Sequence, residues 1–162
     1  MILEIEIPGV PMPKQSVRAH PVYNRNGEPV IYQDKRSGRK KVLIRHHQPK
    51  DITDREKTIA FMIQEQLPDG FLPFQGPVAI NRLHYVFPPL SSFSQKKMSE
   101  IAAGKIHPKT TKPDITDNLA KMIFDCMEGI IYLNDSQVWS QADVRKYYGF
   151  RPGIYITIEG DK

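Results

Sequence analysis

Four charged residues at helical spacing are the first feature of this sequence that could do chemistry: Asp117, Lys121, Asp125 and Glu128. At about 100° per residue, their side chains fall within about 80° of one another on a helix. Asp114 stands just before this stretch, where a side chain in the first turn can point to the same edge. Carboxylates held close together repel one another unless a cation is present, so the group is typical of a site for a divalent metal ion.

A second acidic element, Asn134-Asp135-Ser136-Gln137, follows a short apolar stretch. Carboxylate oxygens with no histidine or cysteine at metal spacing favour Mg²⁺ or Mn²⁺ over Zn²⁺. A purely structural explanation stays open at this point. Asp114 and Asp117 could simply cap a helix, and Lys121 could form ordinary i,i+4 pairs with Asp117 and Asp125 on a solvated face.

These residues must be positioned by a helix over 115–127, whose apolar stripe is Leu119, Met122, Ile123 and Cys126. Further helices are predicted over 53–67 and 94–103. Apolar runs predict strands, and an Asn-Gly turn at 24–27 predicts a hairpin. The strand ranges are 2–7, 77–87, 130–133, 137–148 and 153–159. The sequence therefore predicts a single α+β domain over residues 1–162, with two to three helices packed on a mixed sheet.

Composition excludes several classes of protein. With 40% hydrophobic and 25% charged residues, the sequence is typical of a globular domain and not of a disordered tail or a fibrous repeat. The single cysteine, Cys126, cannot form an intramolecular disulfide, and the first residues lack the basic and apolar parts of a signal peptide. No apolar run is long enough to span a bilayer. We therefore expect a cytoplasmic protein that does not enter a membrane.

The net charge of +5 is unevenly distributed. Residues 14–50 contain ten basic and two acidic side chains, whereas residues 114–143 contain six acidic and one basic side chain. This pattern suits a polyanionic substrate brought to a metal ion, although ordinary solvated charge explains it equally well. The segment 35–41 is predicted to be an exposed basic loop. The best candidates for phosphate contacts are Lys14, Arg18, Lys35, Arg36, Arg39, Lys40 and Lys41.

An ordered set of motifs runs through the second half of the chain: Lys112-Pro113-Asp114, Asp117-Asn118-Leu119, Lys121, Asp125, Gly129, Tyr132 and Asp135-Ser136-Gln137-Val138. A proline-rich start over 7–15 precedes it. Together these motifs resemble the pattern of the RusA-type Holliday-junction resolvases, also called crossover junction endodeoxyribonucleases. The resemblance covers almost the whole chain. Many members have one residue between the first two aspartates, whereas Ile115 and Thr116 separate them here.

The resemblance implies a RusA-like fold in which Asp114, Asp117 and Asp135 hold Mg²⁺, with Mn²⁺ as a substitute, and Lys121 assists catalysis at the scissile phosphate. Asp125 is a weaker candidate for the same site. It also implies a homodimer that cleaves branched DNA, namely four-way junctions, in recombination and repair, because two symmetric cuts need two active sites. Two alternatives remain: a branched-DNA-binding protein without cleavage activity, and a nucleic-acid-binding module whose acidic helix contacts a protein partner.

Overall fold

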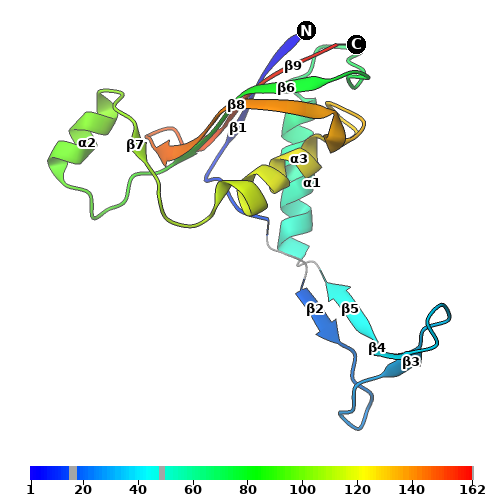
Figure 1. Cartoon of the computed structure of the whole chain (residues 1–162). Coiled ribbons are helices and arrows are strands. Elements are labelled where there is room, and N and C mark those ends of the chain that lie inside the picture. Colours follow the sequence, from blue (N-terminus) through cyan, green and yellow to red (C-terminus); the bar gives the residue numbers. More distant parts are fainter. Residues whose placement is uncertain (15–17, 48–49, 162) are drawn as a thin grey trace. The chain divides into compact units, whose positions relative to one another are not determined.

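The computed structural model describes residues 1–14, 18–47 and 50–161, except for the side chains of residues 18, 19, 46 and 47. The chain divides into two compact units. Unit 1 comprises residues 1–14 and 54–162, and unit 2 comprises residues 15–53. Figure 1 labels their helices and strands. That all 162 residues form a single domain stays a prediction.

Unit 1 is built on a five-stranded sheet with the strand order β1-β9-β6-β8-β7. Its strands are β1 (Ile2–Pro8), β6 (Val78–Phe87), β7 (His107–Pro108), β8 (Val138–Tyr148) and β9 (Gly153–Gly160). Strands β6 and β8 run parallel, and the other neighbours are antiparallel. This mixed sheet, together with helices α1 (Lys50–Gln64), α2 (Gln95–Ala102) and α3 (Lys121–Met127), confirms the predicted α+β class.

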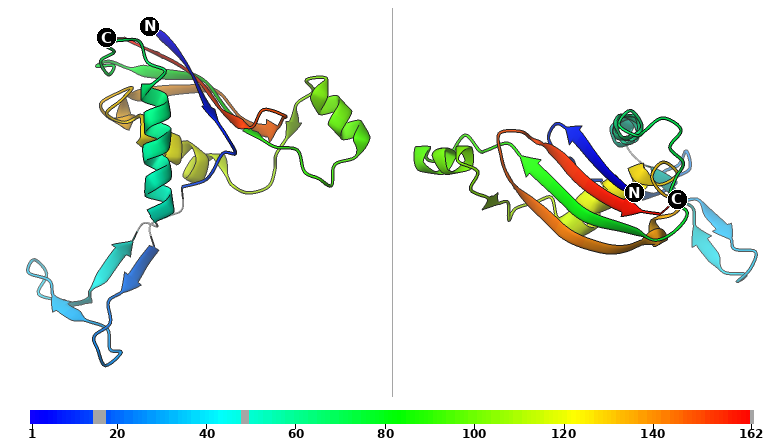
Figure 2. Two further views of the ribbon diagram at one scale, coloured as in Figure 1. Left: turned by 180° about the vertical axis from the view of Figure 1, so that it is seen from behind. Right: turned by 90° about the horizontal axis from the view of Figure 1, so that it is seen from above.

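Side chains on β1 alternate between exposed and buried along the strand, which shows that one face of this sheet is covered and the other is open to solvent. Helix α3, and α1 from Asp54 onward, lie against the covered face (Figure 2). The predicted stripe on α3 is buried, and the Cys126 thiol lies 3.6 Å from the Glu56 carbonyl oxygen. Burial raises the pKa of Cys126 to about 12, so this thiol is a packing group and not a nucleophile.

The parallel pairing of β6 with β8 decides where the predicted site residues meet, because parallel strands require a long crossover connection. The crossover runs through α2 and β7 and then through a π-helix, η1 (Ile115–Ala120), which continues directly into α3. It returns to the sheet through a short 3₁₀ helix, η2 (Asp135–Gln137), immediately before β8. The start of the acidic helix and the second acidic element are therefore both carried by one connection.

Unit 2 consists of two antiparallel two-stranded ribbons: β2 (Arg18–Pro21) with β5 (Ile44–His47), and β3 (Ile31–Gln33) with β4 (Lys40–Val42). The predicted turn forms, with Gly27 at φ +80° and its N–H donating to the Asn24 carbonyl oxygen at 3.1 Å. Lys40 and Lys41 belong to β4, so the predicted loop over 35–41 is too long. The backbone N–H of Asp34 donates to the Arg39 carbonyl oxygen and closes the turn earlier.

Two other predicted elements differ in the structure. Helix α1 begins at Lys50 and ends at Gln64. The N–H groups of Gln66 and Leu67 bond three residues back and tighten the chain before Pro68. The strand predicted over 130–133 is wrong. The N–H groups of Ile130 and Ile131 both donate to the Met127 carbonyl oxygen, so the apolar run forms a turn and contributes only isolated bridges. No helix among the residues with assigned positions is long and apolar enough to cross a membrane.

Candidate active site

The helix that carries the predicted ligands begins with a π-turn. Asp114 is its N-cap, and the N–H of Leu119 donates to the Asp114 carbonyl oxygen, five residues earlier, at 3.3 Å. A π-turn holds more residues than an α-turn, so it can take up an additional residue without ending the helix. We interpret this turn as the way in which the chain accommodates two residues, Ile115 and Thr116, between Asp114 and Asp117.

The Asp114 carboxylate is a helix cap. It accepts hydrogen bonds from the Asp117 backbone N–H at 3.0 Å and from the Asn118 side-chain amide. Desolvation raises its pKa, but hydrogen bonds from the Asn118 side chain and from backbone N–H groups of the first turn together outweigh that effect, and the pKa lies below its ordinary value. Two acceptor positions of Asp114 are thus already used by its own helix, as the structural explanation requires.

A cavity of about 330 Å³ lies beside this helix and brings together residues that are distant in the chain. Lys121 and Asp125 line it from α3, Asp135 lines it from η2, and Gln141 lines it from β8. Asp114 and Asp117 are not among the placed residues of its lining. The 100° step of an α-helix does not hold through a π-turn, so the angular prediction that joined Asp117 to Lys121 and Asp125 does not describe this cavity.

The charged groups of this region differ in whether the protein already pairs them. Asp125 forms an ion pair with Lys14. Within the described ranges, the side chains of Asp117, Lys121 and Asp135 make no hydrogen bond or ion pair with another protein group. All three are exposed at least in part. Unpaired charges of both signs in and beside one cavity are available to an external ligand.

The carboxylate oxygens of Asp117 and Asp135 are the type of ligand that a hard divalent ion prefers. In residues 1–14, 18–47 and 50–161, no three histidine, cysteine or carboxylate side chains gather closely enough to hold a metal ion by themselves. Mg²⁺, however, keeps several waters and is commonly bound by one or two carboxylates together with substrate phosphate. Asp135 in the cavity satisfies that requirement, with Asp117 on the adjacent π-turn. The three-aspartate ligand set stays a prediction.

Comparison with known proteins finds a family whose sequence pattern this chain matches. A family model described as Endodeoxyribonuclease RusA matches residues 26–159. The chain belongs to the RusA family. A Bacillus subtilis (strain 168) protein named Uncharacterized protein YqaN is 29% identical over 133 residues, which are 82% of this chain and 90% of that relative. Membership of the RusA family implies endodeoxyribonuclease activity in general terms and agrees with carboxylates and a lysine around one cavity.

Lys14 has protein partners in this RusA-family chain, although the sequence favoured it as a phosphate contact. Its ammonium group pairs with Glu56 at 2.8 Å and with Asp125, and its backbone N–H donates to the Asn118 carbonyl oxygen at 3.2 Å. The side chain is only 15% exposed. Desolvation lowers the pKa of Lys14, but the two carboxylates outweigh it and the pKa is raised. Lys14 therefore ties the N-terminal segment to the helix that lines the cavity.

Replacing Lys14 by methionine is expected to lower the free energy of unfolding by about 2 kcal/mol, because two partly buried carboxylates lose their cation. The Lys14 pKa is raised on folding, so the stabilisation is complete below the pKa of the unfolded chain and is lost as the pH rises through the higher folded pKa. Urea unfolding of both proteins from pH 7 to pH 11 measures the difference. A difference that does not shrink at alkaline pH would contradict this assignment.

Gln137 fixes the turn that carries Asp135. Its side-chain oxygen accepts from the N–H groups of Leu133 at 2.8 Å and Asn134 at 2.9 Å, and its amide nitrogen donates to the carbonyl oxygens of Phe74 and Gly76, both at 2.9 Å. The sequence marked Gln137 only as part of a motif. The structure adds its physical role, which is to lock η2 against the segment before β6.

Changing Gln137 to leucine removes four hydrogen bonds while nearly preserving volume. We expect the free energy of unfolding to fall by about 2 kcal/mol and the DNA cleavage rate to fall about 10-fold or more, because Asp135 loses its fixed position. Urea unfolding and single-turnover cleavage measure the two effects. Gln75→Leu is the matched control, since Gln75 is exposed and donates only to the Pro73 carbonyl oxygen. Equal behaviour of the two variants would remove Gln137 from the site.

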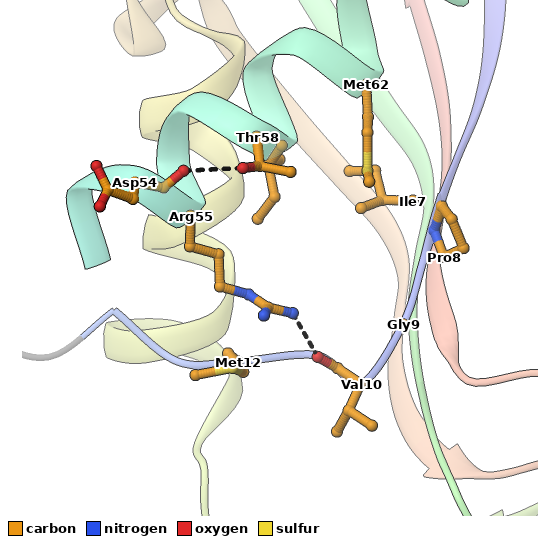
Figure 3. Close-up of a pocket in the computed structure, with 10 residues that line it drawn as sticks. Ile7, Pro8, Gly9, Val10, Met12, Asp54, Arg55, Thr58 and Met62 are labelled. Carbon is orange, nitrogen blue, oxygen red and sulfur yellow. Dashed lines mark hydrogen bonds between the residues drawn. The ribbon is translucent and has the colours of Figure 1, made fainter. Parts of the chain in front are cut away.

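A second cavity, of about 530 Å³, lies between the end of β1 and α1 (Figure 3). Its lining is mostly apolar. The Arg55 guanidinium donates to the Val10 carbonyl oxygen at 2.9 Å and tethers the segment after β1. Without a set of convergent acids, this cavity is a weaker candidate for phosphodiester chemistry than the one beside α3.

The predicted phosphate contacts of unit 2 lie on exposed backbone. Lys35, Arg36 and Arg39 are in the turn between β3 and β4, and Lys40 begins β4. Lys41 differs from these four because it pairs with Asp34 and holds the pKa of that carboxyl below its usual value. Arg18 begins β2, but its side chain lies outside the described residues. The prolines and cations of residues 11–18 predict an exposed extended segment, of which residues 15–17 lie outside the described residues.

Proposed function

We propose that this chain is a Mg²⁺-dependent, structure-selective endodeoxyribonuclease that hydrolyses phosphodiester bonds in four-way DNA junctions during recombination and repair. The observation that carries the proposal is the cavity shared by Lys121 and Asp135, two charges of opposite sign from separate segments that have no ion-pair partner in the described part of the chain. Family membership supports the same reaction class. The cytoplasmic location expected from the composition stays a prediction.

In this proposal Asp117 and Asp135 hold the metal ion, and Asp114 contributes through the acceptor positions that its helix leaves open. When bound, Mg²⁺ polarises a phosphoryl oxygen and lowers the pKa of a water molecule. Lys121 donates to the phosphoryl oxygens and stabilises the negative charge that grows on them in the transition state. Asp125 is matched by Lys14, so its role is to place α3 and not to take up a second cation.

Resolution of a four-way junction requires two cuts of matching orientation, so we propose that two copies of the chain act as a homodimer. Cations on unit 2 contact the phosphates of the duplex arms, and selectivity for the branched structure comes mainly from these backbone contacts. Mn²⁺, which accepts similar oxygen ligands, is expected to substitute for Mg²⁺.

A labelled four-way junction incubated with the protein, with and without Mg²⁺, tests the function. We expect paired strand cuts that require the metal, with much slower cleavage of a linear duplex of the same sequence. Tight junction binding without strand scission in Mg²⁺ or Mn²⁺ would instead support the non-catalytic branched-DNA-binding protein.

Changing Arg39 and Lys40 together to alanine is expected to weaken junction binding and to lower the slope of log affinity against log salt by about 2, because each lost phosphate contact contributes about 0.9. Lys41→Ala is the control. The Lys41 charge is already matched by Asp34, so the slope should change much less. Fluorescence anisotropy at several salt concentrations measures both. An unchanged slope for the double variant would remove this turn from the DNA interface.

A further inference from the structure

The two units differ in charge, and unit 1 has no net attraction for DNA. Residues 1–14 and 54–162 contain fourteen lysines and arginines against fifteen aspartates and glutamates, whereas residues 15–53 carry a net charge of +6. The cavity with Lys121 and Asp135 lies in unit 1. A phosphate backbone held at an acidic cavity needs cations nearby on the same unit, because attraction between exposed charges is screened within about 10 Å at 0.1 M salt.

Unit 1 concentrates its lysines in one segment. Residues 95–113 contain five lysines and only one acid, Glu100, and they lead directly into Asp114. This segment comprises α2 and β7, and Figure 1 shows α2 projecting beyond the end of the sheet at which β7 pairs with β8. The Lys105 ammonium group forms an ion pair with Glu100 at 3.2 Å, so its charge is already balanced within the protein. The other four lysines make no ion pair with any described residue.

Two of these lysines are held over aromatic rings. The Lys97 ammonium lies 3.6 Å from the Phe93 ring centroid and 5.8 Å from that of Tyr148. The Lys109 ammonium lies 5.1 Å from the Phe87 centroid and 5.6 Å from that of Tyr148. A ring face attracts a cation without neutralising it, so both ammonium groups are positioned and still carry full charge.

The rings themselves form a packed cluster. Phe87 and Tyr148 are each 7% exposed, and the Phe93 and Tyr148 rings meet edge to face with centroids 4.9 Å apart. Lys109 is further fixed by a hydrogen bond to the Thr111 hydroxyl at 2.6 Å, and its backbone N–H donates to the Lys146 carbonyl oxygen at 3.0 Å. We refer to Lys97 and Lys109 on Phe87, Phe93 and Tyr148 as the lysine platform. A cationic surface fixed in advance loses little side-chain entropy when a ligand binds.

We propose that the lysine platform is a second DNA-binding surface, on unit 1, which contacts backbone phosphates of the DNA whose bond is cut. The inference rests on the proposed nuclease function and adds a contact that the basic turn of unit 2 does not supply. Phosphate is the ligand that this chemistry fits, because an ammonium group is a compact point charge and most protein–DNA hydrogen bonds from such groups go to phosphate oxygens. The contact is therefore independent of DNA sequence and sensitive to salt.

The test compares junction binding by wild type, Lys97→Gln with Lys109→Gln, and Lys97→Arg with Lys109→Arg. Glutamine removes the charge, whereas arginine keeps both the charge and the contact with the rings. We expect the glutamine variant to lose about 10-fold in affinity at 0.1 M salt and about 2 in the slope of log affinity against log salt. The arginine variant should stay within about 2-fold of wild type. Lys57→Gln, at an exposed site on α1, is the control and should change neither quantity.

Thermal unfolding of each variant identifies a folding defect, and the arginine variant keeps the test decisive if the glutamine variant is destabilised. If wild type cleaves the junction and the glutamine variant keeps both its affinity and its salt slope, the platform alone is rejected. A fall that the arginine variant shares in full would also reject it, since charge would not be the cause. If wild type neither binds nor cleaves branched DNA, the nuclease function and the platform are rejected together.

Discussion

Asp135→Asn is expected to lower the rate of junction cleavage by about 1,000-fold or more while junction binding stays equal or becomes tighter. Asparagine has nearly the same shape as aspartate but lacks the charge that holds a divalent ion. Removing a negative charge from the cavity also lowers its repulsion toward DNA phosphate. Single-turnover cleavage at saturating protein, together with anisotropy at the same salt concentration, separates these two effects.

Asp69→Asn is the matched control for that experiment, because Asp69 is an exposed loop carboxylate outside the cavity with Lys121. This control variant should cleave the junction as fast as wild type does.

Asp114→Asn adds a second comparison. Asparagine caps helices as well as aspartate does, so this variant can keep the bond from the Asp117 backbone N–H, but it loses the charge and the acceptor of the Asn118 side-chain amide. We expect a smaller loss than at Asp135, since the helix already uses two acceptor positions of Asp114. Wild-type cleavage by Asp135→Asn would contradict the assigned role of Asp135.

Lys121→Ala is expected to lower the cleavage rate by about 100- to 1,000-fold with little change in junction affinity. The reason is that Lys121 faces the cavity without a carboxylate partner among the described residues, so its charge acts mainly on the group that reacts there. A cation that stabilises the transition state more than the bound substrate changes the rate and not the affinity.

The measurement for Lys121 is again single-turnover cleavage, at several Mg²⁺ concentrations. Lys121→Arg should recover part of the rate because it restores the charge in a different shape. A loss that excess Mg²⁺ fully reverses would show that any added cation replaces the Lys121 charge, and this would contradict a specific role of Lys121 at the phosphate. A fall in the cleavage rate of less than about 10-fold would show that Lys121 takes no direct part in the reaction.

Local patterns in the sequence predicted most of unit 1, because they report which face of an element is buried. The spacing of Leu119, Met122, Ile123 and Cys126 identified the buried face of η1 and α3, and the predicted helix over 94–103 corresponds to α2 with Ser94 as its N-cap. The alternation over 77–87 corresponds to β6. The apolar run at 130–133 is not a strand, because its two buried side chains, Ile131 and Tyr132, are buried from a turn.

The site was harder to predict, because its geometry depends on contacts between distant residues. The π-turn after Asp114 departs from the 100° step on which the angular argument rested, and composition gives no sign of it. The partners of Lys14 are 42 and 111 residues away in the chain, so its position in a basic segment predicts a DNA contact instead of these two ion pairs. The Asp-x-Gln motif pointed to Gln137, but only the structure explains it, through hydrogen bonds to the segment before β6.

Anomalous diffraction from crystals soaked in Mn²⁺ tests the account most directly, because it locates the ion independently of activity. We expect a manganese peak bonded to a carboxylate oxygen of Asp135, in the cavity that Lys121 also lines. Soaking of the Asp135→Asn variant should remove that peak. A well-diffracting Mn²⁺-soaked crystal with no ion at Asp135, or with its ion held entirely by other residues, would contradict the proposed metal-dependent site.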